Sequence, residues 1–155
     1  MPVTRRVPSL ALGCLLLILA AGAPGAEPRA TPAEARAMAE RAAAAIECQG
    51  RDRAFAAFED RRGGFVDREM FVVAMDRTGR VLAHGARPSY VGMNMSDLTD
   101  VRGDRFVERM LTLPEDGFLE YFWQNPLTEK IEHKTSYVVV RPDHVLFVGA
   151  YASHP

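Results

Sequence analysis

Hydrogen-bond donors gather in one aromatic segment, residues 117–126, which holds Tyr121 and the only Trp of the chain, Trp123. A lone lysine, Lys134, follows shortly after it. Hydroxyl, indole N–H and ammonium groups are all hydrogen-bond donors. Aromatic side chains with polar groups more often line a small-molecule pocket or its rim, which favours such a pocket at Tyr121 and Trp123. The plainer alternative is that the aromatic residues, Phe118 and Phe122 above all, are core.

Motifs for catalysis are lacking in the sequence. There is no nucleophile elbow, no Cys/His pairing with motif spacing, no phosphate-binding glycine loop and no haem attachment motif. The four histidines, His84, His133, His144 and His154, lack the spacing of metal ligands. Glu120 and Glu132 do not make a convincing acid–base pair. We therefore expect no enzyme, no catalytic residues, no metal site and no cofactor.

Strand alternation must position the donors. Residues 117–126 are rich in aromatic residues, open with Asp-Gly and close with Asn-Pro, which is typical of a β-strand. Side chains of a strand point alternately to its two faces. This places Leu119, Tyr121 and Trp123 on one face, and Phe118, Glu120 and Phe122 on the other. Neither set is polar enough to lie bare in water, so we expect material packed on both faces of the sheet.

Capping and periodicity predict the other elements. Thr31, Pro32 and Glu34 begin a helix that runs to about Gln49, where Gly50 ends it. A shorter helix from about residue 52 follows. Strands are predicted at 70–76 and 80–84 around a turn, then an irregular stretch at 85–99 with one helical turn near 96–98. A helix capped by Asp104 runs to residue 112, and strands at 135–140 and 144–152 follow the aromatic strand.

This order of elements predicts an α+β fold. One hairpin and three consecutive strands make a five-stranded antiparallel sheet. The long N-terminal helix covers one face, and a helical-loop insert, residues 85–112, covers the other.

The first 26 residues have the layout of a secretory signal peptide. Arg5 and Arg6 precede an apolar run from 10 to 21, and small residues follow at 22–26, where cleavage is expected. The run is too short for a comfortable membrane span, and no second one follows. We expect an exported, periplasmic or secreted, single domain over residues 27–155 that has no stable membrane insertion after cleavage.

Charge and cysteine content narrow the partners further. The formal net charge is −1, and no basic stripe or nucleic-acid motif occurs, which argues against a nucleic-acid partner. Of the two cysteines, Cys14 lies in the predicted signal peptide. Cys48 then cannot form an internal disulfide, and we expect it to be a small buried residue near a helix end.

In order and spacing, several segments resemble the single Cache domains, the PAS-like extracellular sensor modules of bacterial chemoreceptors and sensor kinases. The segments are 71–84, 88–98, 106–110, 117–126, 134–138 and 148–151, so that nearly all of the predicted mature chain is covered. The resemblance implies a five-stranded antiparallel sheet behind a long N-terminal helix. It also implies a pocket between sheet and insert for small organic molecules, often short carboxylates.

Nine side chains are candidates for such a pocket. They are Tyr121, Trp123, Lys134 and Tyr137, then His84, Tyr90 and Met95 from the opposite wall, and Phe71 and Val73 as the floor. Lys134 could instead be a solvated loop residue, His84 a strand-end histidine with local partners, and Tyr90 and Met95 simple packing. Alternation also separates Lys134 from Tyr137, unless Lys134 precedes the regular strand or a bulge intervenes.

Two features depart from the receptor pattern. No signalling domain follows in the sequence, which predicts a free-standing exported domain that presents a carboxylate-like ligand to a membrane sensor protein. Trp123-Gln124-Asn125-Pro126 stands where many relatives have Pro-Lys-Pro after the Trp, so a loop lysine is missing. The alternative function is a protein-interaction or structural module whose pocket has collapsed.

Overall fold

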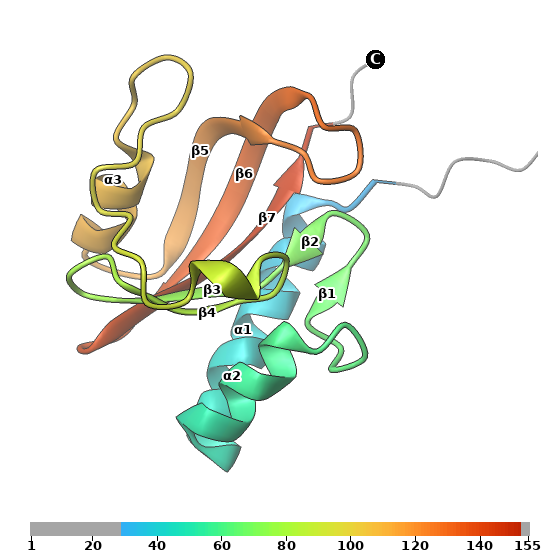
Figure 1. Cartoon of the computed structure of the whole chain (residues 1–155), viewed down its shortest axis with the longest axis vertical. Helices are drawn as coiled ribbons and strands as arrows, with labels where there is room; N and C mark the ends of the chain where they lie inside the picture. Colours follow the sequence, from blue (N-terminus) through green and yellow to red (C-terminus); the bar gives the residue numbers. More distant parts are fainter. Residues whose placement is uncertain (1–28, 153–155) are drawn as a thin grey trace, which may run out of the picture.

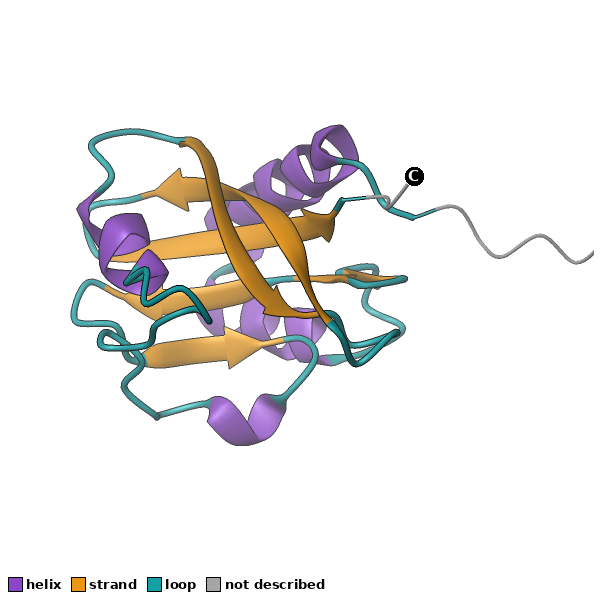
Figure 2. Ribbon diagram, turned by 90° about the horizontal axis from the view of Figure 1, so that it is seen from above, coloured by secondary structure: helices purple, strands orange, loops and turns teal. Residues whose placement is uncertain are grey.

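Five antiparallel strands in the order β4-β3-β7-β6-β5 form the central sheet of the computed structural model, which describes residues 29–152 (Figure 1). The strands are β3 (Val73–Asp76), β4 (Val81–His84), β5 (Gly117–Gln124), β6 (Ile131–Val140) and β7 (His144–Tyr151). Figure 2 shows how strongly the sheet twists, with its longest strands curving across the others. The predicted α+β fold is confirmed, and the predicted signal peptide lies outside the described residues.

Two strands differ from their predicted bounds. The strand predicted at 70–76 divides into β2 (Met70–Phe71), which pairs with β1 (Val66–Asp67) in a small second sheet, and β3. The backbone changes partners at Val72, whose N–H donates to Phe65 and whose carbonyl accepts from Gly85. β6 begins at Ile131, four residues before the predicted 135, so Lys134 lies inside a regular strand.

α1 (Pro32–Gln49) covers one face of the sheet and contacts β6 and β7. The predicted capping box is confirmed, because Thr31 and Glu34 each accept a hydrogen bond from the other's backbone N–H. The buried stripe of the helix is mostly alanine: Ala35, Met38, Ala39, Ala42 and Ala43. These small side chains let the helix lie close to the sheet and make a solid layer with β6 and β7.

The second helix, α2 (Arg51–Glu59), begins within one residue of its predicted start. Its Phe58 is fully buried and packs against Phe55 and Phe65, with ring centroids 5.9 and 4.7 Å away. Cys48 is exposed, so the expectation of a buried cysteine is wrong. It lies outside the stripe that α1 turns toward the sheet.

The insert covers the other face with η1 (Pro88–Tyr90), loops and α3 (Phe106–Thr112), so that β5, β6 and β7 run between α1 and α3 (Figure 1). The predicted helical turn near 96–98 is only a β-turn, and the helical turn occurs at η1, which Pro88 begins. Asp104 does not cap α3. Its carboxylate pairs with Arg109, and Arg105 occupies the N-cap position without a side-chain hydrogen bond.

Backbone hydrogen bonds hold the insert against the β3–β4 turn. Met95 N–H donates to the Gly79 carbonyl, and Val81 exchanges bonds with residues 92 and 93. Gly79 has a φ of +86°, and a Cβ there would lie 2.9 Å from Ser96 Cβ, so only glycine permits this close approach. The segment of the insert from residue 92 to 96 is therefore fixed to the β3–β4 hairpin.

The two ends of the described chain lie together at the β5–β6 loop. Arg29 Nη1 donates to Glu132 Oε2 over 2.5 Å and to the Ala152 carbonyl over 3.0 Å. Asn125 and Thr128 of the loop also donate to Glu132, which is 2% exposed. The Arg29 hydrogen bond lowers the pKa of Glu132 to about 2. Across residues 29–152, no helix has both the length and the apolar character needed to pass through a lipid bilayer.

Candidate ligand-binding site

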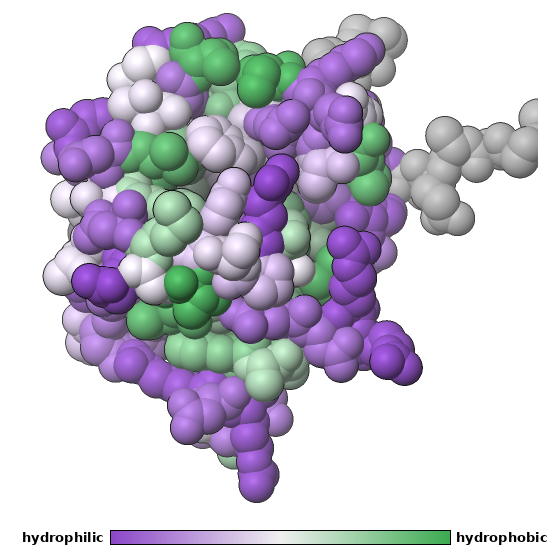
Figure 3. Space-filling view, viewed as in Figure 1, coloured by the Kyte–Doolittle hydropathy of each residue, from purple (hydrophilic) through white to green (hydrophobic). Residues whose placement is uncertain are grey.

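A cavity of about 590 Å³ lies between the sheet and the insert. Eight of the nine candidate side chains line it: Phe71, Val73, His84, Tyr90, Met95, Tyr121, Trp123 and Lys134. Hydrophobic residues lie in small groups among hydrophilic ones on the face of the molecule seen in Figure 3. The cavity is open, so the protein's own side chains do not fill the space that a ligand would occupy.

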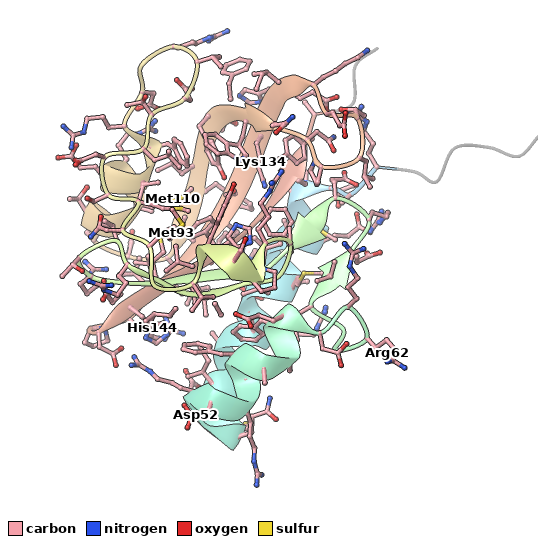
Figure 4. The ribbon with its side chains drawn as sticks, viewed as in Figure 1. Asp52, Arg62, Met93, Met110, Lys134 and His144 are labelled. Atoms are coloured by element: carbon pink, nitrogen blue, oxygen red, sulfur yellow. The ribbon has the colours of Figure 1, made fainter. Side chains whose placement is uncertain are left out.

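Lys134, labelled in Figure 4, is a charged residue in the lining of the cavity. It is only 3% exposed, which overturns the alternative of a solvated loop lysine. Its Nζ lies 4.6 Å from the ring centroids of Phe71 and Tyr151 and makes no hydrogen bond or ion pair with any residue in the described range. Burial lowers the pKa of Lys134 to about 7, and the nearby charge of Glu69 offsets part of this effect.

A glycine makes room for the lysine. A Cβ on Gly149, in the neighbouring strand β7, would lie 2.2 Å from Lys134 Cε and 2.3 Å from Ser136 Oγ. No larger residue can occupy this position while Lys134 and Ser136 keep their places. The position of the ammonium group therefore depends on a residue that makes no polar side-chain contact of its own.

His84 lies beside Lys134 as a neutral ring. Its Nδ1 accepts a hydrogen bond from the Arg87 backbone N–H over 3.0 Å, so the ring proton is on Nε2. Burial, followed by the charges of Lys134 and Arg87, lowers the pKa of His84 to about 4. The ring stacks on Phe71 at 5.1 Å, and the edge contact with Tyr90 is 5.4 Å between centroids. His84 thus has its local partner and still lines the cavity.

Beside Lys134, at the neighbouring strand β5, lies an aromatic stack. The rings of Phe106 and Tyr121 are parallel within 4°, with centroids 4.2 Å apart, and Trp123 is 5.2 Å from Phe106. The Tyr121 hydroxyl shares a 3.0 Å hydrogen bond with Ser136, and burial raises the pKa of Tyr121. Tyr121 is therefore an uncharged wall residue whose hydroxyl already has a partner.

Tyr137 does not belong to this cavity, and its assignment as a lining residue is corrected. Its ring packs under α1, with Arg36 5.2 Å above it and Phe118 at 4.9 Å. The pairing of β6 with β5 is regular from Ile131 to Val138, with no bulge between Lys134 and Tyr137. Three residues of regular strand put the two side chains on opposite faces.

Several lining residues were missed, and some had a sequence signal. Met75 continues the alternation of Phe71 and Val73, and the same period of two predicts it. Phe106, the first residue of α3 in the insert, is part of the cavity wall. Arg87 is an exposed residue at the rim. Within residues 29–152, no cluster of His, Cys, Asp and Glu could hold a metal ion.

The sheet, the helix behind it and the insert in front define a Cache-type, PAS-like sensor fold. The sequence profile of the single Cache domain 2 family matches residues 26–153, and the chain belongs to this family. A search of curated protein sequences gives no significant match.

Solved structures of sensor domains share the fold. A methyl-accepting chemotaxis protein from Vibrio parahaemolyticus superposes with a TM-score of 0.66 at 23% identity, over 77% of this chain and 86% of that chain. A periplasmic sensor domain of a chemotaxis protein gives 0.61 at 20% identity, over 78% and 90%. A Cache chemosensory domain described for carboxylic acid recognition gives 0.60 at 18% identity, over 78% and 88%.

Proposed function

We propose that this protein is an exported sensor-type domain that binds a small organic acid between the sheet and the insert. The observation that carries the proposal is the buried ammonium of Lys134, which makes no direct hydrogen bond or ion pair with the described residues and has only the more distant charge of Glu69 near it. A buried charge without a partner is costly, and a ligand carboxylate removes that cost. His84 Nε2 supplies a second donor on the same wall.

The family supports the proposed location and the proposed partner. Structural neighbours include a periplasmic sensor domain of a chemotaxis protein, which supports a periplasmic or secreted location for this chain. A domain of this kind can present its loaded state to a membrane sensor protein. The alternative of a collapsed pocket has no support in the structure, because the cavity is open.

A thermal-shift screen of organic acids tests the proposal. A ligand that binds only the native state increases the free energy of unfolding, by about 2.7 kcal/mol when its concentration is a hundred times its Kd. This increase raises the melting temperature. Acids should stabilise the protein, and their amides and alcohols should not. The absence of any shift with acids across a broad panel would refute the proposal.

A further inference from the structure

The cations Lys134 and Arg87 and the His84 ring N–H lie on one side of the cavity, while the Trp123 indole N–H is on β5. Lys134 and His84 are linked through the ring of Phe71, and His84 is linked to Tyr90 by an edge contact. Arg87 lies at the rim beside them, 5.7 Å above the Tyr90 ring, and its guanidinium makes no ion pair within residues 29–152. An anionic group is therefore expected at this end of the cavity.

Polar groups elsewhere in the lining are already occupied. The amide of Asn94 donates to the Thr78 carbonyl and accepts from Ser96. The carboxylate of Asp97 pairs with Arg105, and the hydroxyl of Tyr121 bonds to Ser136. The amide nitrogen of Gln124 donates to the Glu129 carbonyl. The exception is Trp123, which is partly buried and whose indole N–H makes no hydrogen bond within residues 29–152.

The rest of the surface is apolar and large. Six apolar lining residues belong to one hydrophobic cluster and form a continuous apolar wall: Met75, Met95, Leu98, Phe106, Val107 and Phe147. A two- or three-carbon acid would occupy a small part of 590 Å³ and leave water against these side chains. Apolar surface removed from water contributes about 25 cal/mol per Å², so a ligand that covers this wall gains affinity.

From this division of the cavity we infer that the preferred ligand is a monocarboxylic acid with an aryl or branched apolar body of about six to ten carbon atoms. Its carboxylate lies against Lys134 and His84, and its body lies against the Phe106 stack and the methionines. The inference rests on the proposed function, and it names the class of acid that the same site selects.

Calorimetric titration of a chain-length series tests the inference. The series runs through acetate, propanoate, butanoate, hexanoate, phenylacetate and 3-phenylpropanoate, with succinate and 2-phenylethanol as comparison compounds. Affinity should rise about three- to fourfold for each methylene, so that 3-phenylpropanoate binds at least about 30-fold more tightly than acetate. Succinate and 2-phenylethanol should each bind at least about tenfold more weakly than phenylacetate.

The outcomes separate the two claims. If acetate or propanoate binds as tightly as the phenyl acids, or succinate binds more tightly, the inference on ligand class is overturned while the proposed function stands. If no acid binds, or 2-phenylethanol binds as well as phenylacetate, the proposed function itself fails.

A cavity-filling variant tests where the apolar body of the ligand lies. Leu98→Trp, in the half-buried part of the insert, should weaken binding of 3-phenylpropanoate about tenfold and change binding of propanoate by less than about twofold. Leu127→Trp is the matched control, because Leu127 is 63% exposed and outside the cavity lining. Met95→Trp repeats the test from another position. Unchanged binding of 3-phenylpropanoate by both cavity variants would overturn the placement.

Discussion

The two faces of the sheet use the same strands in opposite ways. Toward α1, alanine-rich helix packing leaves a solid layer in which small side chains sit directly on β6 and β7. Toward the insert, large aromatic side chains stand apart around a cavity. Lys134 and Tyr137 are three residues apart in β6, and one enters the cavity while the other enters the layer. The comparison teaches that one face is packed for stability, while the other leaves open space and a buried lysine at some cost in stability.

Among the variants proposed here, Lys134→Met should have the largest effects on stability and on acid affinity. Methionine keeps the apolar stem and removes a buried charge, so we expect the ligand-free protein to gain on the order of a few kcal/mol at pH 7. Loss of the charge-assisted bond should weaken binding of acids about 10- to 100-fold. Chemical denaturation and calorimetric titration measure the two quantities.

The control for this substitution is Lys130→Met, at an exposed loop position, which should change neither quantity. A Lys134→Met protein that is less stable than the wild type and binds acids normally would show that the lysine has a structural role only.

Ala39→Leu tests the solid face. Ala39 lies fully buried on the sheet-facing side of α1, and added methylenes in a packed layer cost about 1–3 kcal/mol. Urea unfolding should show this loss, while the Kd of the folded protein for acids stays the same. Ala37→Leu makes the same change at an exposed position of α1 and should be neutral. Equal stability of the two variants would show that the layer between α1 and the sheet is not closely packed.

The pH dependence of folding stability should test whether Lys134 alone causes the stability cost of the cavity face. The pKa of Lys134 is about 7 in the folded protein and 10.5 as its ordinary value, so the unfolded chain binds more protons between these values. Stability of the ligand-free protein should therefore rise from pH 7 toward 10.5, and the gain should be absent in Lys134→Met. The neighbouring His84 is neutral throughout this range.

Acid binding has the opposite slope. A bound carboxylate favours the ammonium form of Lys134, so affinity should fall several-fold as pH rises from 7 to 9. Titrations in buffers of different ionisation enthalpy should show proton uptake on binding near pH 8. Affinity that does not change over this range would rule out Lys134 as the partner of the carboxylate.

The smallest effects separate the two tyrosines. Tyr121→Phe removes the bond to Ser136 beside the cavity and should cost about 0.5–1.5 kcal/mol of stability, with a change in acid affinity of a few-fold. Tyr137→Phe on the α1 face should leave acid affinity unchanged. Parallel titrations of the two variants compare them directly, and a larger loss of affinity in Tyr137→Phe would reverse the assignment of the faces.

Local patterns predicted most of the fold and part of the site. The capping residues of α1 and the alternation of Leu119, Tyr121 and Trp123 depend on near neighbours in the sequence, so they could be predicted. Alternation also predicted the separation of Lys134 and Tyr137, and the bulge or late strand start needed to bring them together is not there.

What could not be predicted depends on distant partners. The burial of Lys134 requires the space at Gly149 and the cover of the insert, which come from other parts of the chain. Asp104 was expected to cap α3, but its carboxylate pairs with Arg109 instead. The volume of the cavity is set by how far the insert stands from the sheet, and no spacing in the sequence encodes that distance.

The contact of Arg29 with the Ala152 carbonyl has a practical consequence. Because these two positions are neighbours, a short linker can join the domain at both ends to a loop of a fluorescent reporter without crossing the cavity. Arg29 also donates to Glu132, and so do Asn125 and Thr128. Asn125 directly precedes Pro126, which lines the cavity. The two grafting points therefore lie close to one lining residue of the cavity.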